Sequence, residues 1–128
     1  MKTGYTVAIS ILAGTALGAT VMSGLHAQGK AAGAYTVIDI SEITDVDTFK
    51  QLLPKGAAVV TASGGQFIMR TENIIARDGS PPKRFVVIAF DTMDKAKTWS
   101  SSAAQKEVDV LREKSTKSRS FIVEGSTN

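Results

Sequence analysis

The run Arg-Phe-Val-Val-Ile-Ala-Phe at residues 84–90 constrains the fold more than any other part of this sequence. A segment with β-branched or aromatic side chains at most of its positions is typical of a strand that is buried on both faces. Directly after it, residues 92–94 carry a helix start signal, and Ala96 and Trp99 follow at helical spacing. The stretch therefore predicts a central strand that leads directly into a helix.

Upstream of this strand, the sequence predicts a first strand and then a helix. Residues 34–40 carry apolar groups on both faces, so we expect helices on one face of the sheet and a partner subunit on the other. Thr44 or Asp45 is expected to cap the helix that follows. Pro54 should kink or restart this helix, because proline removes a backbone donor. Gly64-Gly65 should end it.

The middle of the chain predicts a hairpin. A second strand is expected at residues 66–70, with residues 73–76 as a candidate extension. The sequence Asp-Gly-Ser-Pro-Pro at residues 78–82 is a strong turn signal, and the central strand follows it. These two strands should therefore pair in an antiparallel manner.

The last third of the chain predicts a broken helical region and a final strand. Ser102 and Gln105 have the spacing of a capping box, so we expect a break at residues 100–102 and a fresh helix to about residue 115. A last strand is expected at residues 120–124. The order βαββαβ indicates a ferredoxin-like α+β fold, with a four-stranded antiparallel sheet and its helices on one face.

The N-terminal segment predicts export. Residues 1–27 contain a single charged side chain, Lys2, followed by a moderately apolar run and a small residue at Ala27. This pattern predicts a secretory signal peptide that is cleaved after Ala27. The alternative is a retained membrane anchor, because about 20 apolar residues can span a bilayer. With cleavage, we expect a periplasmic or secreted protein without stable membrane association.

The remaining chain is expected to form a linker (residues 28–33), one domain (34–125) and a short tail (126–128). Its 14 basic side chains (15 in the full sequence, less Lys2) face 12 acidic ones, and the two kinds are interspersed. Near the C-terminus, Arg112 and its basic neighbours alternate with Glu113 and serines, which is typical of a solvated helix face. We therefore expect no nucleic-acid partner.

The absence of two residue types excludes several chemistries. The sequence has no cysteine, and its one histidine, His26, lies in the segment that we expect to be removed. Cysteine nucleophiles, histidine acid–base catalysis, Cys/His zinc sites and His-ligated haem are then excluded from the exported domain. Asp45 and Asp47 lack the glycine and the terminal glutamate of a calcium loop, so we expect no metal site and no cofactor.

Several short motifs, in their order and spacing, resemble a known family. They are Ala34-Tyr35, Gly64-Gly65-Gln66-Phe67 with Arg70, Gly79, Pro82-Lys83-Arg84, Phe90-Asp91, Trp99 with Ser102, and the stretch from Arg119 to Gly125. Over residues 34–125 the chain resembles the DUF1330 family, a bacterial domain of unknown function.

The resemblance implies a dimeric α+β barrel, in which two ferredoxin-like sheets pack face to face. The family usually has an aromatic residue directly after the tryptophan and Pro-x-Tyr after the serine. This chain instead has Ser100 and Ala103-Ala104-Gln105 at those places. A pocket role of those aromatic side chains is therefore not expected here. Wider relatives of the fold include cofactor-free monooxygenases, lactone isomerases and haem proteins, but a fold does not fix a function.

Four polar side chains on the predicted strands form the candidate site. With the first and third strands parallel, Tyr35 would lie beside Arg84, and Glu124 and Arg70 would reach the same end of the sheet. Such a cluster could bind an anion or carry out acid–base chemistry. Alternatively, it could be an ion-pair network that fixes the register of a dimer. We also expect Trp99 to lie in the core, with stacking on a ligand as the alternative.

These features lead to two functional hypotheses. The first is an exported, dimeric, ferredoxin-like protein that binds a small organic ligand. The second is a cofactor-free enzyme, an isomerase or monooxygenase, that acts on a small organic acid or lactone. In the enzyme, catalysis would fall to Glu124, Asp39 or Tyr35, with Arg84 or Arg70 stabilising an anion.

Overall fold

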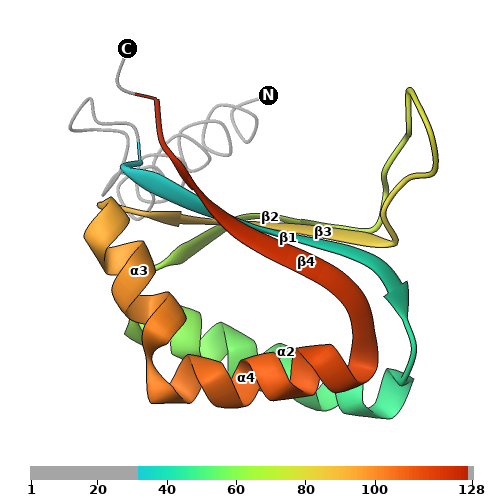
Figure 1. Ribbon diagram of the computed structural model, residues 1–128, viewed down its shortest axis with the longest axis horizontal. Helices are drawn as coiled ribbons and strands as arrows, with labels where there is room; N and C mark the ends of the chain where they lie inside the picture. Colours follow the sequence, from blue (N-terminus) through green and yellow to red (C-terminus); the bar gives the residue numbers. More distant parts are fainter. Residues whose placement is uncertain (1–31, 127–128) are drawn as a thin grey trace, which may run out of the picture. The chain divides into compact units, whose positions relative to one another are not determined.

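Four strands form one antiparallel sheet, and the helices of the described region lie against one of its faces (Figure 1). The computed structural model describes residues 32–126. Along the chain the elements are β1 (Ala34–Ile43), α2 (Val46–Ala62), β2 (Gln66–Thr71), β3 (Arg84–Phe90), α3 (Met93–Ser101), α4 (Ala103–Ser115) and β4 (Thr116–Glu124). This arrangement confirms the predicted ferredoxin-like α+β fold.

The predicted signal peptide (1–27) and most of the predicted linker (28–33) lie outside the described residues. Within residues 32–126, every helix is too short or too polar to cross a bilayer. Cleavage or retention of the N-terminal segment therefore stays a prediction.

The strand order is β2-β3-β1-β4, as the ferredoxin-like arrangement requires. However, β1 and β3 are antiparallel neighbours, so our prediction of parallel first and third strands is wrong. The reason lies in the connections. The crossover through α2 makes β2 run parallel to β1, and β2 and β3 are antiparallel neighbours, so β3 runs opposite to both.

Strand β3 is buried on its helix side, whereas Phe85 and Val87 on the other face are only partly buried. Val86, Ile88 and Phe90 face the helices, and all three are buried. Phe90 also contacts Trp99 of α3, with 5.3 Å between the ring centroids. The prediction that Trp99 lies in the core is therefore confirmed, since Trp99 is 4% exposed. Trp99 also lines a cavity that is described below.

Helix α2 begins at the alternative cap Asp45. Its Oδ1 accepts a hydrogen bond from the backbone N–H of Thr48 (3.1 Å), and its Oδ2 accepts one from the Thr48 hydroxyl (2.8 Å). These bonds favour the ionised carboxylate, and they lower the pKa of Asp45. The predicted restart at Pro54 is wrong, because α2 runs through it without a break. Pro54 and Lys50 are exposed, so water can solvate the carbonyl that loses its partner.

The predicted break between the two C-terminal helices is confirmed at Ser102. Its backbone is extended, and its hydroxyl accepts a hydrogen bond from the Gln105 N–H (3.2 Å). The same hydroxyl donates to the Trp99 carbonyl (2.8 Å). Ser102 therefore ends α3, begins α4 and fixes the corner between Trp99 and Gln105.

Three strand boundaries differ from the prediction. β1 extends to Ile43 and β4 begins at Thr116, because these two residues pair with each other beyond a bulge in β1. Residues 73–76 do not continue β2. Thr71 pairs with Phe85, next to the first residue of β3, so a longer β2 would have no partner strand.

The sheet face opposite the helices is largely apolar. A row of four side chains crosses all four strands in register, and it consists of Met69, Val87, Val37 and Phe121. These residues alternate with the positions that face the helices, so they point to the other side. No helix of residues 32–126 covers this face (Figure 1).

Candidate ligand-binding site

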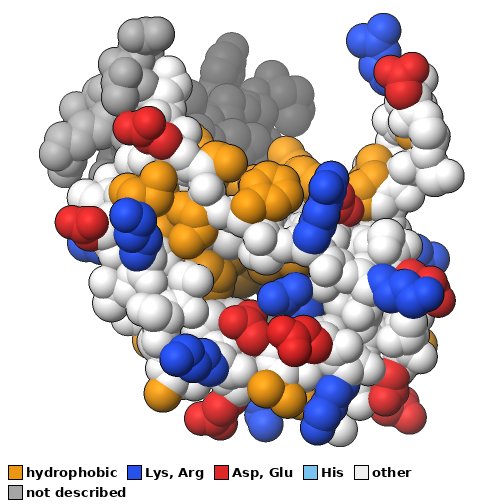
Figure 2. All heavy atoms as spheres, viewed as in Figure 1, with side chains coloured by type: hydrophobic (Ala, Val, Ile, Leu, Met, Phe, Trp, Pro, Cys, Tyr) orange, Lys and Arg blue, Asp and Glu red, His pale blue; other side chains and the backbone are white. Residues whose placement is uncertain are grey.

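A cavity of about 190 Å³ lies between the sheet and the helices. The surface is hollowed between these two layers, with hydrophobic side chains inside the hollow and charged ones near its rim (Figure 2). Most lining residues are apolar or glycine: Ile38, Ile40, Phe49, Leu52, Leu53, Gly56, Ala57, Val60, Phe67, Val86, Ile88, Trp99 and Val108. The polar lining residues are Arg70, Arg84, Gln105 and Arg112.

The apolar wall follows from the alternation along the strands and from the spacing along α2. Ile38 and Ile40 of β1 occupy alternate positions, so both point to the helix side. Leu52 and Gly56 lie four residues apart on α2 and share the face that meets them. Gly56 leaves room, since a methyl group added there would lie 3.5 Å from Val108. The cavity is thus a hollow between the sheet and the helices that opens to the surface.

Two of the arginines are held by carboxylates. Nη1 of Arg84 lies 3.4 Å from Oε2 of Glu72, and the Arg84 side chain is 18% exposed. Nη2 of Arg112 lies 3.4 Å from Oδ1 of Asp109, and its Nη1 donates to the Ser118 hydroxyl at 2.9 Å. These contacts fix both guanidinium groups at the cavity and offset their charges.

Arg70 differs from the other two arginines. Its guanidinium carbon lies 4.3 Å from the centroid of the Phe67 ring, in a cation–π contact. No carboxylate in the described part of the chain forms an ion pair with it. The cavity therefore has one positive charge that residues 32–126 leave without a counter-charge.

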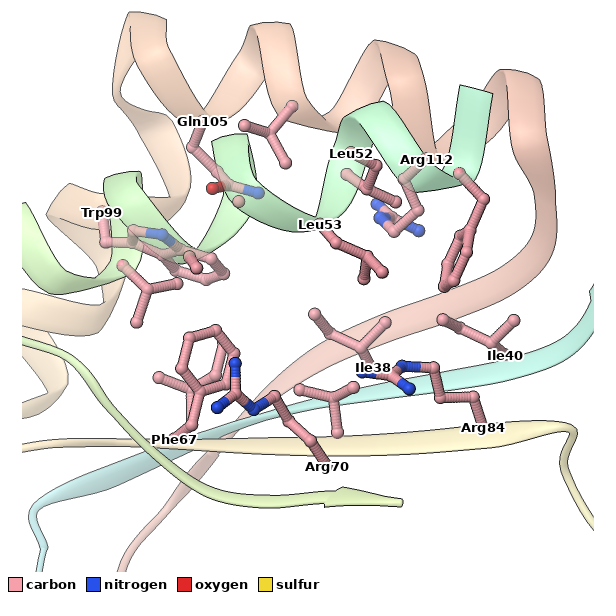
Figure 3. A pocket seen from close by; sticks show the side chains of 17 residues that line it. Ile38, Ile40, Leu52, Leu53, Phe67, Arg70, Arg84, Trp99, Gln105 and Arg112 are labelled. Atoms are coloured by element: carbon pink, nitrogen blue, oxygen red, sulfur yellow. The ribbon is translucent and has the colours of Figure 1, made fainter. Parts of the chain in front are cut away.

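The polar side chains reach the cavity from both layers (Figure 3). Arg70 and Arg84 rise from the sheet, and Arg112 descends from α4. Trp99 and Gln105 lie at the other end of the same space. Arg84 and Arg112 thus lie toward one end of the cavity, whereas the Arg70 guanidinium lies over the Phe67 ring.

The predicted cluster of four polar side chains does not form. Because β1 and β3 are antiparallel, Arg84 lies opposite Ile40 in the strand register, whereas Tyr35 lies opposite Ala89 near the other end of β3. Glu124 is exposed and lies opposite Ala34. The structure separates Tyr35 and Glu124 from the two arginines, and it brings Arg70 and Arg84 to one cavity.

The proposed catalytic side chains are also outside the cavity. Asp39 lies on the opposite sheet face and accepts a hydrogen bond from Arg119 Nε at 3.3 Å. Tyr35 alternates with Thr36, which is buried on the helix side, so it too faces away. None of the described residues that line the cavity is Asp, Glu, Tyr, His or Cys.

Sequence reasoning missed Arg112 and Gln105 as lining residues. Arg112 was assigned to a solvated helix face, since its sequence neighbours are charged. Its spacing of four from Val108 was the available signal, because residues four apart share a helix face. Gln105 stands where the resembled family has a tyrosine, and its burial was the part that the sequence did not indicate.

Potential metal ligands are scattered. In residues 32–126, no three of the Asp, Glu, His and Cys side chains are grouped so that they could hold a metal ion.

The fold and this cavity define a ferredoxin-like α+β domain with an arginine-lined space between its layers. Residues 33–126 match the family described as "Domain of unknown function (DUF1330)", and the chain belongs to that family. No curated protein matches the sequence.

Solved structures with little sequence similarity share the fold. A protein of unknown function from Rhodopseudomonas palustris has a TM-score of 0.62 at 8% identity, covering 85% of this chain and 94% of its own. SnoaB from Streptomyces nogalater, a cofactor-independent oxygenase, has a TM-score of 0.54 at 15% identity, with coverage of 77% and 97%. A hypothetical Arabidopsis thaliana protein has a TM-score of 0.58 at 12% identity, with coverage of 76% and 91%.

Proposed function

We propose that this domain binds a small organic carboxylate in the cavity between the sheet and the helices. The observation that carries the proposal is Arg70, an exposed arginine that lines this largely apolar cavity and forms no ion pair with a carboxylate of residues 32–126. The planar guanidinium group can hold a carboxylate through two parallel hydrogen bonds. Arg84 and Arg112 line the same cavity, but Glu72 and Asp109 offset their charges.

The size and the lining of the cavity define the ligand further. A dry apolar cavity of about 150 Å³ accommodates benzene. A cavity of about 190 Å³ therefore fits one ring, or an apolar group of that size, with a small substituent. Apart from its carboxylate, the ligand should be apolar rather than sugar-like, because binding to apolar walls removes apolar surface from water. The ligand class is thus a monocyclic carboxylate.

A thermal-shift comparison tests this proposal. Benzoate should raise the melting temperature of the full chain in a concentration-dependent manner, because a ligand that binds only the folded state stabilises it. Benzamide has the same ring without the charge, and it should have a much smaller effect. Equal shifts with benzoate and benzamide, or no shift with benzoate, would contradict carboxylate binding.

We further propose that two copies of the chain pair through the apolar sheet face. The row Met69, Val87, Val37 and Phe121 supports this proposal, since Phe121 and Met69 are 43% and 46% exposed. Soluble monomers seldom expose a continuous apolar patch of this kind. A second copy offers the same surface, so an interface with two-fold symmetry would cover both faces.

Export is also a proposal, and it rests on the sequence of residues 1–27. The chain would act in the periplasm or outside the cell after cleavage following Ala27. Mass spectrometry of the exported protein tests it. A mature chain that starts at Gln28 is expected, and an intact Met1 in the exported species would contradict cleavage.

A second candidate function is a cofactor-free enzyme, and the fold that the chain shares with the cofactor-independent oxygenase SnoaB favours it. In this chain the arginines would stabilise an anionic substrate. The described lining has no carboxylate, phenol or imidazole to remove a proton, so the substrate would have to be acidic itself. Oxygen consumption in the presence of a bound ligand separates this candidate from simple binding.

A further inference from the structure

Gly56 lies in the interior of α2, where glycine is an unfavourable residue. Glycine loses more backbone freedom on folding than any other residue, so it destabilises a helix interior relative to alanine. The backbone of Gly56 is helical and does not have a positive φ angle. The conformation of α2 therefore does not explain why this position carries glycine.

The other glycines of residues 32–126 each have a structural reason. Two have a positive φ angle, which other residues rarely adopt. At the remaining three, an added methyl group would lie less than 3.0 Å from a neighbouring atom. In chain order these glycines are Gly33, Gly64, Gly65, Gly79 and Gly125, of which Gly64 and Gly79 have the positive φ angles. Gly56 has neither property.

The space beside Gly56 would accept an alanine side chain. A methyl group there would lie 3.5 Å from Cγ1 of Val108 and 4.0 Å from Cδ1 of Leu52, which are ordinary van der Waals distances. The packing of α2 against α4 therefore does not require glycine at this position. Gly56, Leu52 and Val108 all line the cavity. The methyl group would thus take up space between two side chains of the cavity wall.

We propose that Gly56 is a specificity-determining residue, which keeps open the part of the cavity that receives the apolar ring of the ligand. This inference rests on the proposed function, in which Arg70 binds the carboxylate. Glycine makes α2 less stable than alanine would, and in return it leaves room for a ring between Leu52 and Val108. With alanine at this position, the cavity would select carboxylates that have a smaller apolar part.

Two carboxylates of different size test the inference in the full chain. Benzoate and acetate are titrated into the wild type and into Gly56→Ala, and NMR chemical shifts give the dissociation constants, weak ones included. A difference of one methylene group in an apolar pocket changes binding about tenfold or more, so Gly56→Ala should weaken benzoate binding about tenfold. Acetate has the carboxylate without the ring, and it should bind both proteins equally well.

Urea denaturation provides a second readout that needs no ligand. Gly56→Ala should raise the urea midpoint, because alanine is the better helix former and fits the space. Ala58→Gly is the matched control, since Ala58 is exposed on the same helix and does not line the cavity. It should lower the urea midpoint and leave the benzoate dissociation constant unchanged. Together the two variants separate the stability of α2 from the room in the cavity.

Three results would overturn the role of Gly56 and leave carboxylate binding by Arg70 intact. The first is benzoate binding that Gly56→Ala does not change. The second is equal weakening of benzoate and acetate, because the substitution would then not act through ligand size. The third is a Gly56→Ala variant that is unfolded or less stable than the wild type, which would mean that packing requires the glycine.

Failure of the proposed function gives a different result. If neither carboxylate binds the wild type, carboxylate binding is contradicted, and benzene, which has the ring without the charge, tests Gly56 alone. Benzene binding that Gly56→Ala weakens would support the role of Gly56. A wild type that binds none of the three probes would contradict both proposals.

Discussion

Arg84 pairs with Glu72, with 3.4 Å between Nη1 of the arginine and Oε2 of the glutamate. The predicted cluster brings Glu124 to the same end of the sheet as Arg84. Glu124 instead lies opposite Ala34, whereas Arg84 lies opposite Ile40 six positions along β1. The Arg84–Glu72 pair positions the arginine at the cavity, although half of the Glu72 side chain remains exposed.

The first prediction concerns the stability of Arg84→Met. Glu72 is 54% exposed, so it stays hydrated when its partner is removed, and the pair should contribute at most about 1 kcal/mol to the free energy of unfolding. The aliphatic part of the methionine keeps the packing of the arginine stem. Urea denaturation measures the change, which should be small rather than severe.

A double-mutant cycle identifies the partner of Arg84. Arg84→Met combined with Glu72→Gln should show a small coupling free energy, and Arg84→Met combined with Glu124→Gln should be additive. Coupling to Glu124 of more than about 1 kcal/mol would mean that the strand register described above is incorrect.

The second prediction concerns the apolar sheet face. Phe121→Asp places a charge within the proposed dimer interface, which is costly because the carboxylate would be desolvated without a partner. Light scattering should change from a dimer mass for the wild type to a monomer mass for the variant. Val110→Asp is the control, since Val110 is similarly exposed (49%) but lies on α4, away from this face.

A wild-type protein that is monomeric at micromolar concentration would contradict the dimer proposal. So would a Phe121→Asp variant that remains a dimer while it keeps its fold.

Most of the fold can be predicted from local sequence patterns. The run of β-branched and aromatic residues at 84–90 predicts a strand, and the hydroxyl of Ser102 predicts a helix start; both are confirmed. Of the two cap candidates, Thr44 and Asp45, the structure has Asp45. The predicted break at Pro54 is wrong, because the energetic cost of a proline within a helix depends on solvent exposure, which a local pattern does not contain. The strand order also followed from the βαββαβ pattern.

The candidate site could be predicted only in part, because it depends on contacts that are distant in the sequence. Arg70 and Arg84 can be selected as polar residues on strands. The predicted direction of β3 relative to β1 is wrong, however, and the observed antiparallel pairing places Tyr35 and Glu124 at the other end of the sheet. Gln105 could not be selected from the sequence. Its burial depends on the packing of the whole domain, which a local sequence pattern does not contain. In the structure, its side-chain amide donates a hydrogen bond to Asp109.

The third prediction is a pH effect at the start of α2. Hydrogen bonds from Thr48 lower the pKa of Asp45 below its ordinary value of 3.8. The unfolded chain therefore takes up the proton at a higher pH than the folded one does. The stabilisation from this carboxylate is present above about pH 4 and is lost as the pH falls through the folded-state pKa.

Asp45→Asn tests this effect, because asparagine can cap the helix but has no charge. The difference between the wild type and the variant in the urea midpoint should shrink as the pH is lowered from 6 to 3. Asp78→Asn, in the loop before β3, serves as the control. A difference that does not change with pH would show that the Asp45 charge contributes nothing to the cap.

The central claim, a carboxylate bound by Arg70, is tested most directly by calorimetric titration of benzoate into the wild type and two variants. Arg70→Gln keeps a polar side chain but removes the charge, whereas Arg77→Gln removes an exposed arginine that does not line the cavity. Hydrogen bonds to charged groups contribute about 1.5–3 kcal/mol, so Arg70→Gln should weaken binding at least about tenfold. Arg77→Gln should leave the dissociation constant unchanged. Equal weakening by both variants, or benzoate binding that is insensitive to Arg70→Gln, would contradict the account.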